Sequence, residues 1–437
     1  MTTPRASVLP QGWTRRRLRF DCLSNPVKSK LDLPDDTEVS FVPMDAVGEL
    51  GGLRLDQTRE LADVYNGYTY FADGDVCIAK ITPCFENGKG AIAEELVNGV
   101  AFGTTELHVL RPSATLDTRF LFYLTIAHDF RSHGEAEMLG AGGQKRVPEE
   151  FLKDWTPSLP RIEVQQRIVR FLDDKTARID ALIEKKQALL ERLAEKRQAL
   201  ITRAVTKGLH PDVPMKPSGD ERVGDIPAHW KLLPLKRLVE DGAGLQMGPF
   251  GGMLTDLPDD ATGFKLYGQE NTISGNFELG NRWIEEDRFL ELKRYQLCSG
   301  DLVITRKGSL GSCRMFPEDS LPGIADSDTI RIRPRRGMLS PGWAIALLHD
   351  AQFVADQIAS ERRGAILSGL NTTVVGSILF TVPPEKEQLD IVRKIEDEVR
   401  PIDNVVALID SAMVKLREHR LVLITAAVTG QLPELNG

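Results

Sequence analysis

The chain contains two copies of one large unit. Residues 159–206 match residues 382–429 at a constant offset of 223, without a gap, and 17 of the 48 aligned positions are identical. A weaker match relates residues 71–78 to 297–304. This period is far longer than the roughly 20–50 residues of a solenoid repeat. The duplication therefore predicts two similar domains on one scaffold, able to read two similar but different targets.

The composition is ordinary for a soluble globular protein, with 41% apolar and 27% charged residues. A length of 437 residues predicts about three domains. No apolar run approaches the roughly 20 residues of a membrane helix, and residues 1–5 lack the apolar core of a secretory signal. The five cysteines are scattered and form no CxxC pair, which favours reduced thiols in the cytoplasm.

The net charge of −8 limits how the chain can bind nucleic acid. Neutralisation of phosphates by basic side chains is the main source of nonspecific affinity. An acidic chain is therefore not expected to coat nucleic acid unaided. A reader of nucleic acid whose partners supply positive charge remains possible.

Each copy begins with a strand-rich part that is punctuated by glycine turns such as Asn66-Gly67 and Asp73-Gly74. Short helical patches are expected at residues 120–130 and, in the second copy, at 343–353. The predicted segments are a strand-rich domain (1–158), a helical region (159–208), a linker (209–225), a second strand-rich domain (226–381) and a second helical region (382–437).

The helical regions carry apolar residues at heptad spacing, as in a coiled coil. The residues predicted to form the seam between the two helices are Leu172, Ile179, Leu193, Leu200, Ile395, Ile402, Ile409, Leu416 and Leu423. Because proline breaks or kinks a helix, Pro401 predicts a break in the second region, with a matching break near residues 176–178. The alternative is that the heptads are incidental core periodicity of any duplicated helical domain.

The predicted fold is α+β. Two strand-rich domains are related by a pseudo-twofold axis and separated by an antiparallel coiled coil of the two helical regions. The helices are antiparallel in this prediction because the chain leaves along one helix, forms the second domain and returns along the other.

Several stretches resemble the specificity subunit of Type I restriction-modification systems. The stretches that carry the resemblance are 67–76, 79–90 and 102–106 in the first copy, 246–252 and 300–308 in the second, and the joints 159–165 and 382–388. The joint in that family usually reads Pro-x-x-Glu-Gln. Here Glu387-Gln388 keeps it, whereas Val164-Gln165 replaces the carboxylate.

The resemblance implies a DNA sequence-recognition subunit that reads a bipartite target, with one half read by each target-recognition domain. It implies partners: double-stranded DNA, two modification (methyltransferase) subunits and restriction/translocase subunits, without a membrane. S-adenosylmethionine, ATP and Mg²⁺ are expected on the partners, and no cofactor on this chain. The resemblance also implies a non-catalytic subunit.

Basic and amide side chains near glycine-bearing turns are the candidates for DNA contact. Lysine and arginine can bind phosphates or guanine, and glutamine and asparagine can bind adenine. The predicted DNA-binding residues are Lys80, Thr82, Lys89, Thr104, Thr105, Gln144, Lys145, Arg146, Gln246, Gln269, Arg306, Lys307, Ser327, Thr329, Ser368 and Asn371. The alternative for each is an ordinary surface or capping residue.

No sequence motif indicates catalysis. There is no phosphate-binding GxxxxGK[ST], no GxGxxG after a strand, and the seven histidines lack metal-ligand spacing. Asp75 and Asp301 each follow glycine, where aspartate more often shapes a turn than acts in catalysis. Two rival hypotheses stay open at this point: a two-headed adaptor that binds proteins, and an enzyme with an unrecognised site.

Overall fold

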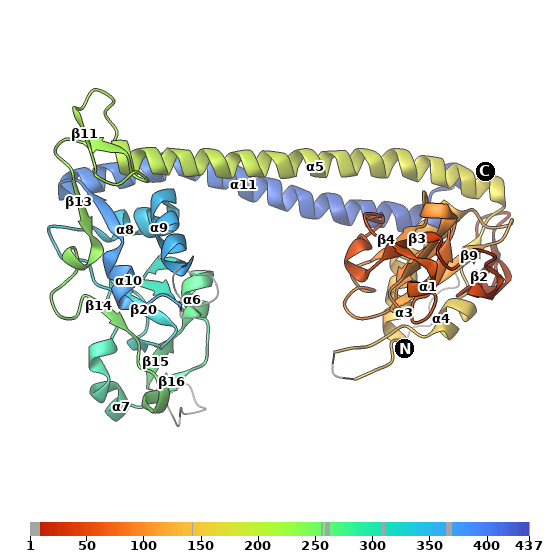
Figure 1. The fold of residues 1–437 in the computed structure, drawn as a ribbon, viewed down its shortest axis with the longest axis horizontal. Helices are drawn as coiled ribbons and strands as arrows, with labels where there is room; N and C mark the ends of the chain where they lie inside the picture. The colour runs from red at the N-terminus through yellow and green to blue at the C-terminus, as the bar shows by residue number, and fades with distance from the viewer. Residues whose placement is uncertain are drawn as a thin grey trace. The chain divides into compact units, whose positions relative to one another are not determined.

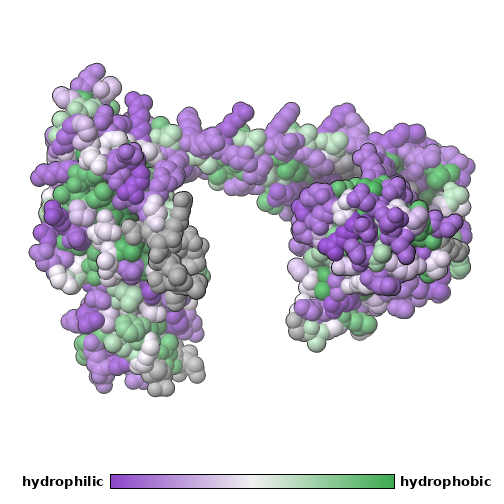
Figure 2. All heavy atoms as spheres, in the orientation of Figure 1, coloured by the Kyte–Doolittle hydropathy of each residue, from purple (hydrophilic) through white to green (hydrophobic). Residues whose placement is uncertain are grey.

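The computed structural model describes residues 9–141, 143–254, 257, 263–306, 311–363 and 369–436. The chain forms two compact units, one of Met1–Gln187 with Asp410–Gly437 and the other of Ala188–Ile409 (Figure 1). The strand-rich part of unit 1, residues 9–158, is called head one. Its counterpart in unit 2, residues 226–381, is called head two. On the face seen in Figure 2, each unit is largely hydrophilic with hydrophobic patches.

Head one contains two four-stranded sheets. The first is antiparallel, in the order β2 (Cys22–Ser24), β9 (Leu107–Pro112), β6 (Val76–Ala79) and β7 (Gly90–Ile92). The second is mixed, in the order β4 (Thr58–Glu60), β3 (Glu38–Val42), β8 (Val100–Gly103) and β5 (Thr69–Ala72), with β3 and β8 parallel. All four residues of β6 are buried, as expected for a short apolar run between turns.

Head two repeats this arrangement. Its antiparallel sheet has the order β14 (Leu245–Met247), β20 (Thr329–Ile332), β17 (Leu302–Thr305) and β18 (Cys313–Met315). Its mixed sheet has the order β16 (Trp283–Ile284), β15 (Phe264–Tyr267) and β19 (Gly323–Ala325), with β15 and β19 parallel. In the described residues this sheet has no strand corresponding to β5. The duplication thus extends to the topology of both sheets except for β5, although the two heads are poorly matched in sequence.

Helices cover the sheets and lead into the joints. Those of unit 1 are α1 (Leu61–Val64), α2 (Thr118–Ile126), α3 (His128–Ala136), α4 (Glu149–Asp154) and α12 (Pro433–Asn436). Those of unit 2 are α6 (Gln269–Ser274), α7 (Glu286–Glu291), α8 (Pro341–Asp350), α9 (Gln352–Arg363) and α10 (Thr372–Ser377). Asp117 caps α2 by accepting from Arg119 N and Phe120 N, and Ser340 caps α8 by accepting from Trp343 N. The predicted helical patches therefore fall on α2–α3 and α8–α9.

A buried aspartate after glycine shapes the same turn in both heads. Asp75 Oδ2 accepts from Ala72 N at 2.8 Å, and both its oxygens bind Arg111 at 2.7 Å. Asp301 accepts from Cys298 N at 2.8 Å and pairs with Arg333 at 2.6 and 2.7 Å. The preceding glycines have φ of +88° and +83°, which side-chain-bearing residues rarely adopt. The turn-shaping role expected for these aspartates is confirmed, and their oxygens are occupied.

The joint between each head and its helix is a short strand ribbon with a buried glutamine. In unit 1, β1 (Thr14–Arg15) pairs with β10 (Ser158–Leu159); in unit 2, β13 (Lys231–Pro234) pairs with β21 (Leu379–Val382). Gln165 Nε2 donates to Pro160 O and Thr115 O, and its Oε1 accepts from Asp117 N. Each joint therefore connects a strand, a head helix and a long helix.

Gln388 repeats every one of these bonds in unit 2. Its Nε2 donates to Pro383 O and Met338 O, and its Oε1 accepts from Ser340 N. The strand β11 (Met215–Pro217) of the predicted linker pairs with β12 (Asp225–Pro227), which begins at the last residue of the linker.

Two long helices, α5 (Ile162–Lys207) and α11 (Glu385–Val428), lie side by side in each unit (Figure 1). In unit 1, Ile168 and Leu172 of α5 share a core with Ile424 and Val428 of α11. In unit 2, the other end of α5 shares a core with the start of α11, through residues that include Ile201, Val205, Ile391 and Val399. The helices are antiparallel in both units. The predicted α+β class with an antiparallel coiled coil is confirmed.

The predicted break at Pro401 is wrong, and so is the matching break near residues 176–178. Both α5 and α11 run through these positions as single helices. Pro401 forfeits one backbone hydrogen bond, at a cost of roughly 3 kcal/mol in a helix interior. Its neighbours Val399 and Ile402 are buried, and each such burial contributes roughly 1.5–3 kcal/mol. Packing of the flanking turns therefore offsets the lost bond.

The residues predicted for the seam between the helices are all shielded from solvent in part or in full. Leu172, Ile179, Ile402 and Ile409 are buried, and the other five are half-buried. Their part in a continuous seam stays a prediction.

Matching ion pairs join the helices in the two units. Arg420 Nε lies 3.0 Å from Asp180 in unit 1, and Arg197 Nε lies 3.2 Å from Asp403 in unit 2. Both partners of one pair lie 223 positions from their equivalents in the other. Arg197 has a second carboxylate, Asp350 at 2.6 Å, whereas Asp180 is the single carboxylate paired with Arg420 in the described residues.

The one-sided pairing of Arg420 predicts different costs for equivalent substitutions. Asp180→Ala should destabilise the helix pair in unit 1 by roughly 1–3 kcal/mol, because a buried guanidinium loses its partner. Asp403→Ala is the matched control and should cost less, because Asp350 still pairs with Arg197. Hydrogen exchange of the helix amides in each unit measures the loss of stability caused by each substitution. Equal losses of protection would contradict the assignment.

The joint predicts a second asymmetry. Glu387 accepts from Trp230 Nε1 at 3.0 Å, whereas the equivalent Trp13 Nε1, in a core shared with Val164, is buried and has no hydrogen-bond partner among the described residues. Glu387→Val should therefore destabilise unit 2 by roughly 1–3 kcal/mol in urea unfolding followed by tryptophan fluorescence. Glu387→Gln keeps an acceptor and should stay near wild type. A Gln variant as unstable as the Val variant would show that the hydrogen bond is not the cause.

Candidate nucleic-acid interface

Three loops of head one meet beyond the end of β6. Lys80 N donates to Glu106 O at 2.9 Å, and Val147 N donates to Lys80 O at 2.9 Å. Thr82 N donates to Lys145 O, also at 2.9 Å. We call this meeting point, formed by Lys80, Glu106 and Val147, the strand-end junction of head one. It brings together the predicted DNA-binding residues Lys80, Thr82, Thr104, Thr105, Gln144, Lys145 and Arg146.

Head two contains the same junction with different side chains. Arg306 N donates to Asp328 O at 3.1 Å, and Leu370 N donates to Arg306 O at 3.0 Å. Gly248 N donates to Thr329 O, which connects the end of β14 to the junction. This junction therefore brings together five of the predicted DNA-binding residues: Gln246, Arg306, Ser327, Thr329 and Asn371. The predicted residues Lys307 and Ser368 lie outside the described residues, as does Gly142 of the loop in head one.

An ion pair dominates the charge of the first junction. Arg146 binds Glu106 with two hydrogen bonds of 2.9 and 2.8 Å. The bonds from Arg146 lower the pKa of Glu106, which stays ionised at neutral pH. His108 below the junction donates from Nε2 to Val147 O, and burial lowers its pKa. The positive side chains that remain available at this junction are Lys80 and the exposed Lys145.

Lys89 stands at the edge of this group. Its Nζ donates to Met44 O at 3.0 Å, and Thr104 N donates to Val42 O nearby in sequence. Thr105, Gln144 and Lys145 are exposed to solvent. Head one thus offers a mixed set of free and engaged polar groups.

Several predicted DNA-binding side chains of head two are hydrogen-bonded within the head. The Arg306 guanidinium donates to Leu370 O and Ser327 O at 2.9 and 2.8 Å. Asn371 caps α10 by accepting from Val374 N, Gln246 donates to Met247 O, and Thr329 donates to Asp326 O. These bonds give the side chains a structural role. Contact with DNA stays a prediction for every residue of the set.

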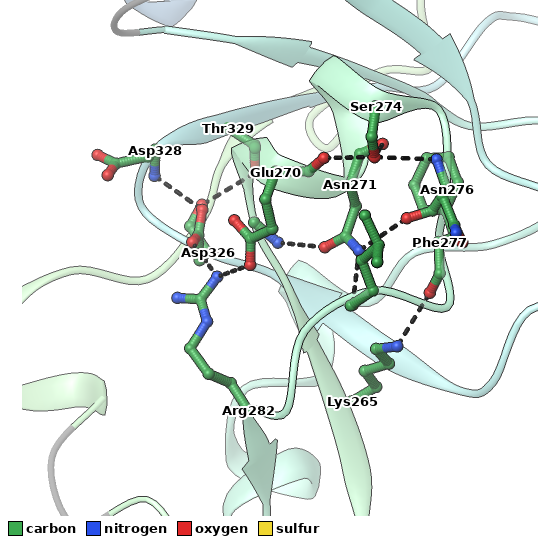
Figure 3. A network of polar contacts seen from close by, with 12 residues as sticks. Lys265, Glu270, Asn271, Ser274, Asn276, Phe277, Arg282, Asp326, Asp328 and Thr329 are labelled. Carbon is green, nitrogen blue, oxygen red and sulfur yellow. Dashed lines mark hydrogen bonds and ion pairs between the residues drawn. The ribbon is translucent and has the colours of Figure 1, made fainter. Parts of the chain in front are cut away.

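A polar network fixes the 326–329 loop from below (Figure 3). Arg282 Nη2 bridges Glu270 at 2.9 Å and Asp326 at 2.8 Å, and Asp326 Oδ1 accepts from Asp328 N at 2.9 Å. Burial raises the pKa of Asp326, against the opposing effect of Arg282. Buried Lys265 donates to Phe277 O and Glu278 O in the same region. The network holds the loop that carries Ser327 and Thr329.

Gln269 is the first residue of α6, and its Oε1 is buried with no hydrogen-bond partner in the part of the chain that the structure describes. No group of three His, Cys, Asp or Glu side chains in the described residues could hold a metal ion. Within the same residues, no helix is long and apolar enough to cross a bilayer.

Sequence reasoning missed the two ion pairs that shape these junctions. The sequence places Glu106 and Arg146 in separate loops, and it gives no signal for Arg282. Opposite charges flanking two loops of one strand-rich domain are a weak signal, because they do not reveal which loops meet. The equivalence of Lys80 and Arg306, each following the matched strand, was visible in the repeat.

The chain is a duplicated α+β protein with a matching polar junction in each of its two heads. Comparisons with known proteins identify one part of it. Residues 22–192 match the Type I restriction modification DNA specificity domain. The specificity subunits of the Type I restriction enzymes EcoAI and EcoEI from Escherichia coli are each 42% identical over 164 residues, or 37% of this chain. The match spans 27% of each relative's own length.

Solved structures extend the likeness in fold to the rest of the chain. A chain from a study of complex assembly and conformational transition of the type I R-M system has a TM-score of 0.72 at 16% identity. It covers 97% of this chain and 100% of its own length. The HsdS subunit from Thermoanaerobacter tengcongensis has a TM-score of 0.50 at 17% identity over 99% of this chain and 100% of its own. The resemblance predicted from the sequence is confirmed.

The ion pair at the first junction predicts a pH effect on the loop that carries Arg146. The pKa of Glu106 is lower in the folded state than its unfolded value of about 4.3. The pair therefore stabilises the loop fully above that pH, and the stabilisation is lost as pH falls through the folded pKa.

Hydrogen exchange tests this effect through Leu139 and Arg146, whose amides bond each other's carbonyls. Their protection, corrected for intrinsic rates, should fall between about pH 6 and 3. Glu106→Gln should remove the pH dependence. Protection that falls equally in this variant would contradict the assignment.

Proposed function

We propose that this chain is the DNA sequence-recognition subunit of a Type I restriction-modification complex. Each head reads one half of a bipartite target. The observation that carries the proposal is the duplicated strand-end junction, which has the same backbone bonds in both heads and different side chains. A common frame with different polar groups suits two different half-sites. The match of residues 22–192 to a DNA specificity domain supports the assignment.

The chain supplies recognition and scaffolding, and its partners supply chemistry. Two modification subunits transfer methyl groups from S-adenosylmethionine, and restriction/translocase subunits use ATP and Mg²⁺ in the cytoplasm. The occupied carboxylates of Asp75 and Asp301 support a non-catalytic chain. The net charge of −8 supports dependence on basic partners for nonspecific DNA affinity.

Single substitutions at the two junctions test the proposal. In a complex reconstituted with modification subunits, Lys80→Ala should affect only one half of the target and Arg306→Ala only the other. If the side chain contacts a base, its loss should reduce discrimination against the wrong base by roughly 1–3 kcal/mol. If it contacts a phosphate, its loss should lower the slope of log affinity against log salt by about one. Methylation mapping and binding titrations at several salt concentrations distinguish the two effects.

Lys80→Arg retains the charge and serves as the control for a phosphate contact. A change of base preference in both halves by one substitution would refute the two-headed proposal. An adaptor that binds proteins needs no salt-dependent affinity for DNA. A complex that lacks such affinity for duplex DNA would therefore favour the alternative, a protein-binding adaptor with two heads.

A further inference from the structure

A cavity of about 500 Å³ opens in head one beside the strand-end junction. Its lining includes Tyr65, Tyr68, Tyr70, Lys28 and Lys80. We call it the tyrosine pocket. It lies where β5, which carries Tyr70, borders the loop that begins after β2. At the place of β5 in head two, the described segment pairs with β19 through the isolated bridge between Gln296 and Ile324, so that Gln296 stands where Tyr70 stands in head one.

The tyrosines are held by the core on one side and border the cavity on the other. Tyr68 packs edge-on against Phe41 with ring centroids 5.1 Å apart, and Tyr70 lies 5.8 Å from Phe102. All three tyrosines are half-buried, as suits a side chain with an apolar body and a polar tip. The hydroxyls of Tyr65 and Tyr68 have no hydrogen-bond partner in the part of the chain that the structure describes. Two donors are therefore available to a ligand.

The charge of the pocket is entirely positive. Lys28 Nζ lies 4.7 Å from the centroid of the Tyr65 ring and donates to Tyr65 O, which fixes one ammonium group at the wall. Lys80 supplies a second ammonium group from the junction. Among the described residues, no aspartate or glutamate lines the pocket. Three other cavities among the described residues each contain carboxylates in their linings. In a chain of net charge −8, a cavity with only positive charges selects an anion.

The pocket is poorly equipped to read a base edge. Base reading relies on side chains with paired donors and acceptors, such as asparagine, glutamine and arginine. Asn25 is the amide in the lining, and both ends of it are occupied. Its Oδ1 accepts from Val109 N at 3.0 Å, and its Nδ2 contacts His108 Nδ1 at 3.4 Å. The remaining groups are ammonium and hydroxyl donors, which suit phosphate oxygens.

We propose that the tyrosine pocket binds a phosphodiester group of the DNA strand that passes the junction of head one. Lys28 and Lys80 supply the charge, Tyr65 and Tyr68 donate hydrogen bonds to phosphate oxygens, and the tyrosine rings contact the sugar. The pocket thereby sets the register of the duplex on head one without reading its sequence. This inference rests on the proposed function and adds a contact that the junction alone does not provide.

Salt titrations of the complex with modification subunits test the pocket on cognate and scrambled duplexes. Lys28→Met should lower the slope of log affinity against log salt by about one, equally on both duplexes. From 50 to 200 mM salt, its affinity should fall about 3.5-fold less than that of wild type. Lys28→Arg should keep the slope. Tyr68→Phe keeps the ring and should weaken binding without changing the slope.

Lys293→Met is the matched control, because Lys293 is an exposed lysine of head two. The methylated motif should be unchanged in all variants. Equal slopes for Lys28→Met and Lys293→Met, with wild-type affinity for Tyr68→Phe, would overturn the pocket while leaving the proposed function intact. A changed motif would overturn the phosphate assignment in favour of a base contact. Circular dichroism checks that each variant is folded. If Lys28→Met is unfolded, the affinity of Tyr68→Phe and the salt slope of Lys28→Arg test the pocket instead.

Discussion

The buried glutamine at each joint is the contact on which the rest of the structure depends. Gln165 and Gln388 are almost fully buried, and each makes three hydrogen bonds that connect a strand end, the start of a head helix and the first turn of a long helix. An unmade bond at a buried amide costs roughly 1–3 kcal/mol, so any movement of the head against its helix end is resisted by three bonds at once. The direction in which each head leaves its helix is set there.

The two joints differ in how completely they satisfy their polar groups. Glu387 accepts from both Trp230 and His229, whereas Val164 in the equivalent place offers no acceptor, and Trp13 Nε1 finds no partner within the described ranges. The first joint keeps its position through apolar packing, since Trp13 and Val164 share a core with Leu172. A duplicated frame can therefore lose one polar contact where hydrophobic burial is sufficient, and its geometry remains the same.

The parts of the fold that the sequence predicts best are those governed by periodicity. The two long helices follow from heptads, and the joints follow from the constant offset of 223. The continuity of the helix at Pro401 could not be predicted, because it depends on the burial of Val399 and Ile402 against residues distant in sequence. In the candidate interface, the positional equivalence of Lys80 and Arg306 in the two heads was predictable from the repeat. The hydrogen bonds of the Arg306 guanidinium were not predictable. One of them joins Arg306 to Leu370, more than sixty positions away in the chain.

The junctions separate the groups that build the frame from those that can vary. Their bonds run between backbone atoms, which every residue except proline provides. Side chains at these positions can therefore differ between heads without breaking the frame, as Lys80 and Arg306 do. Substitution is costly at ion pairs such as Glu106 with Arg146, because a change of one residue leaves the charge of the other without its partner. We expect divergence at a junction to proceed through paired changes at such positions and through single changes at exposed ones such as Lys145.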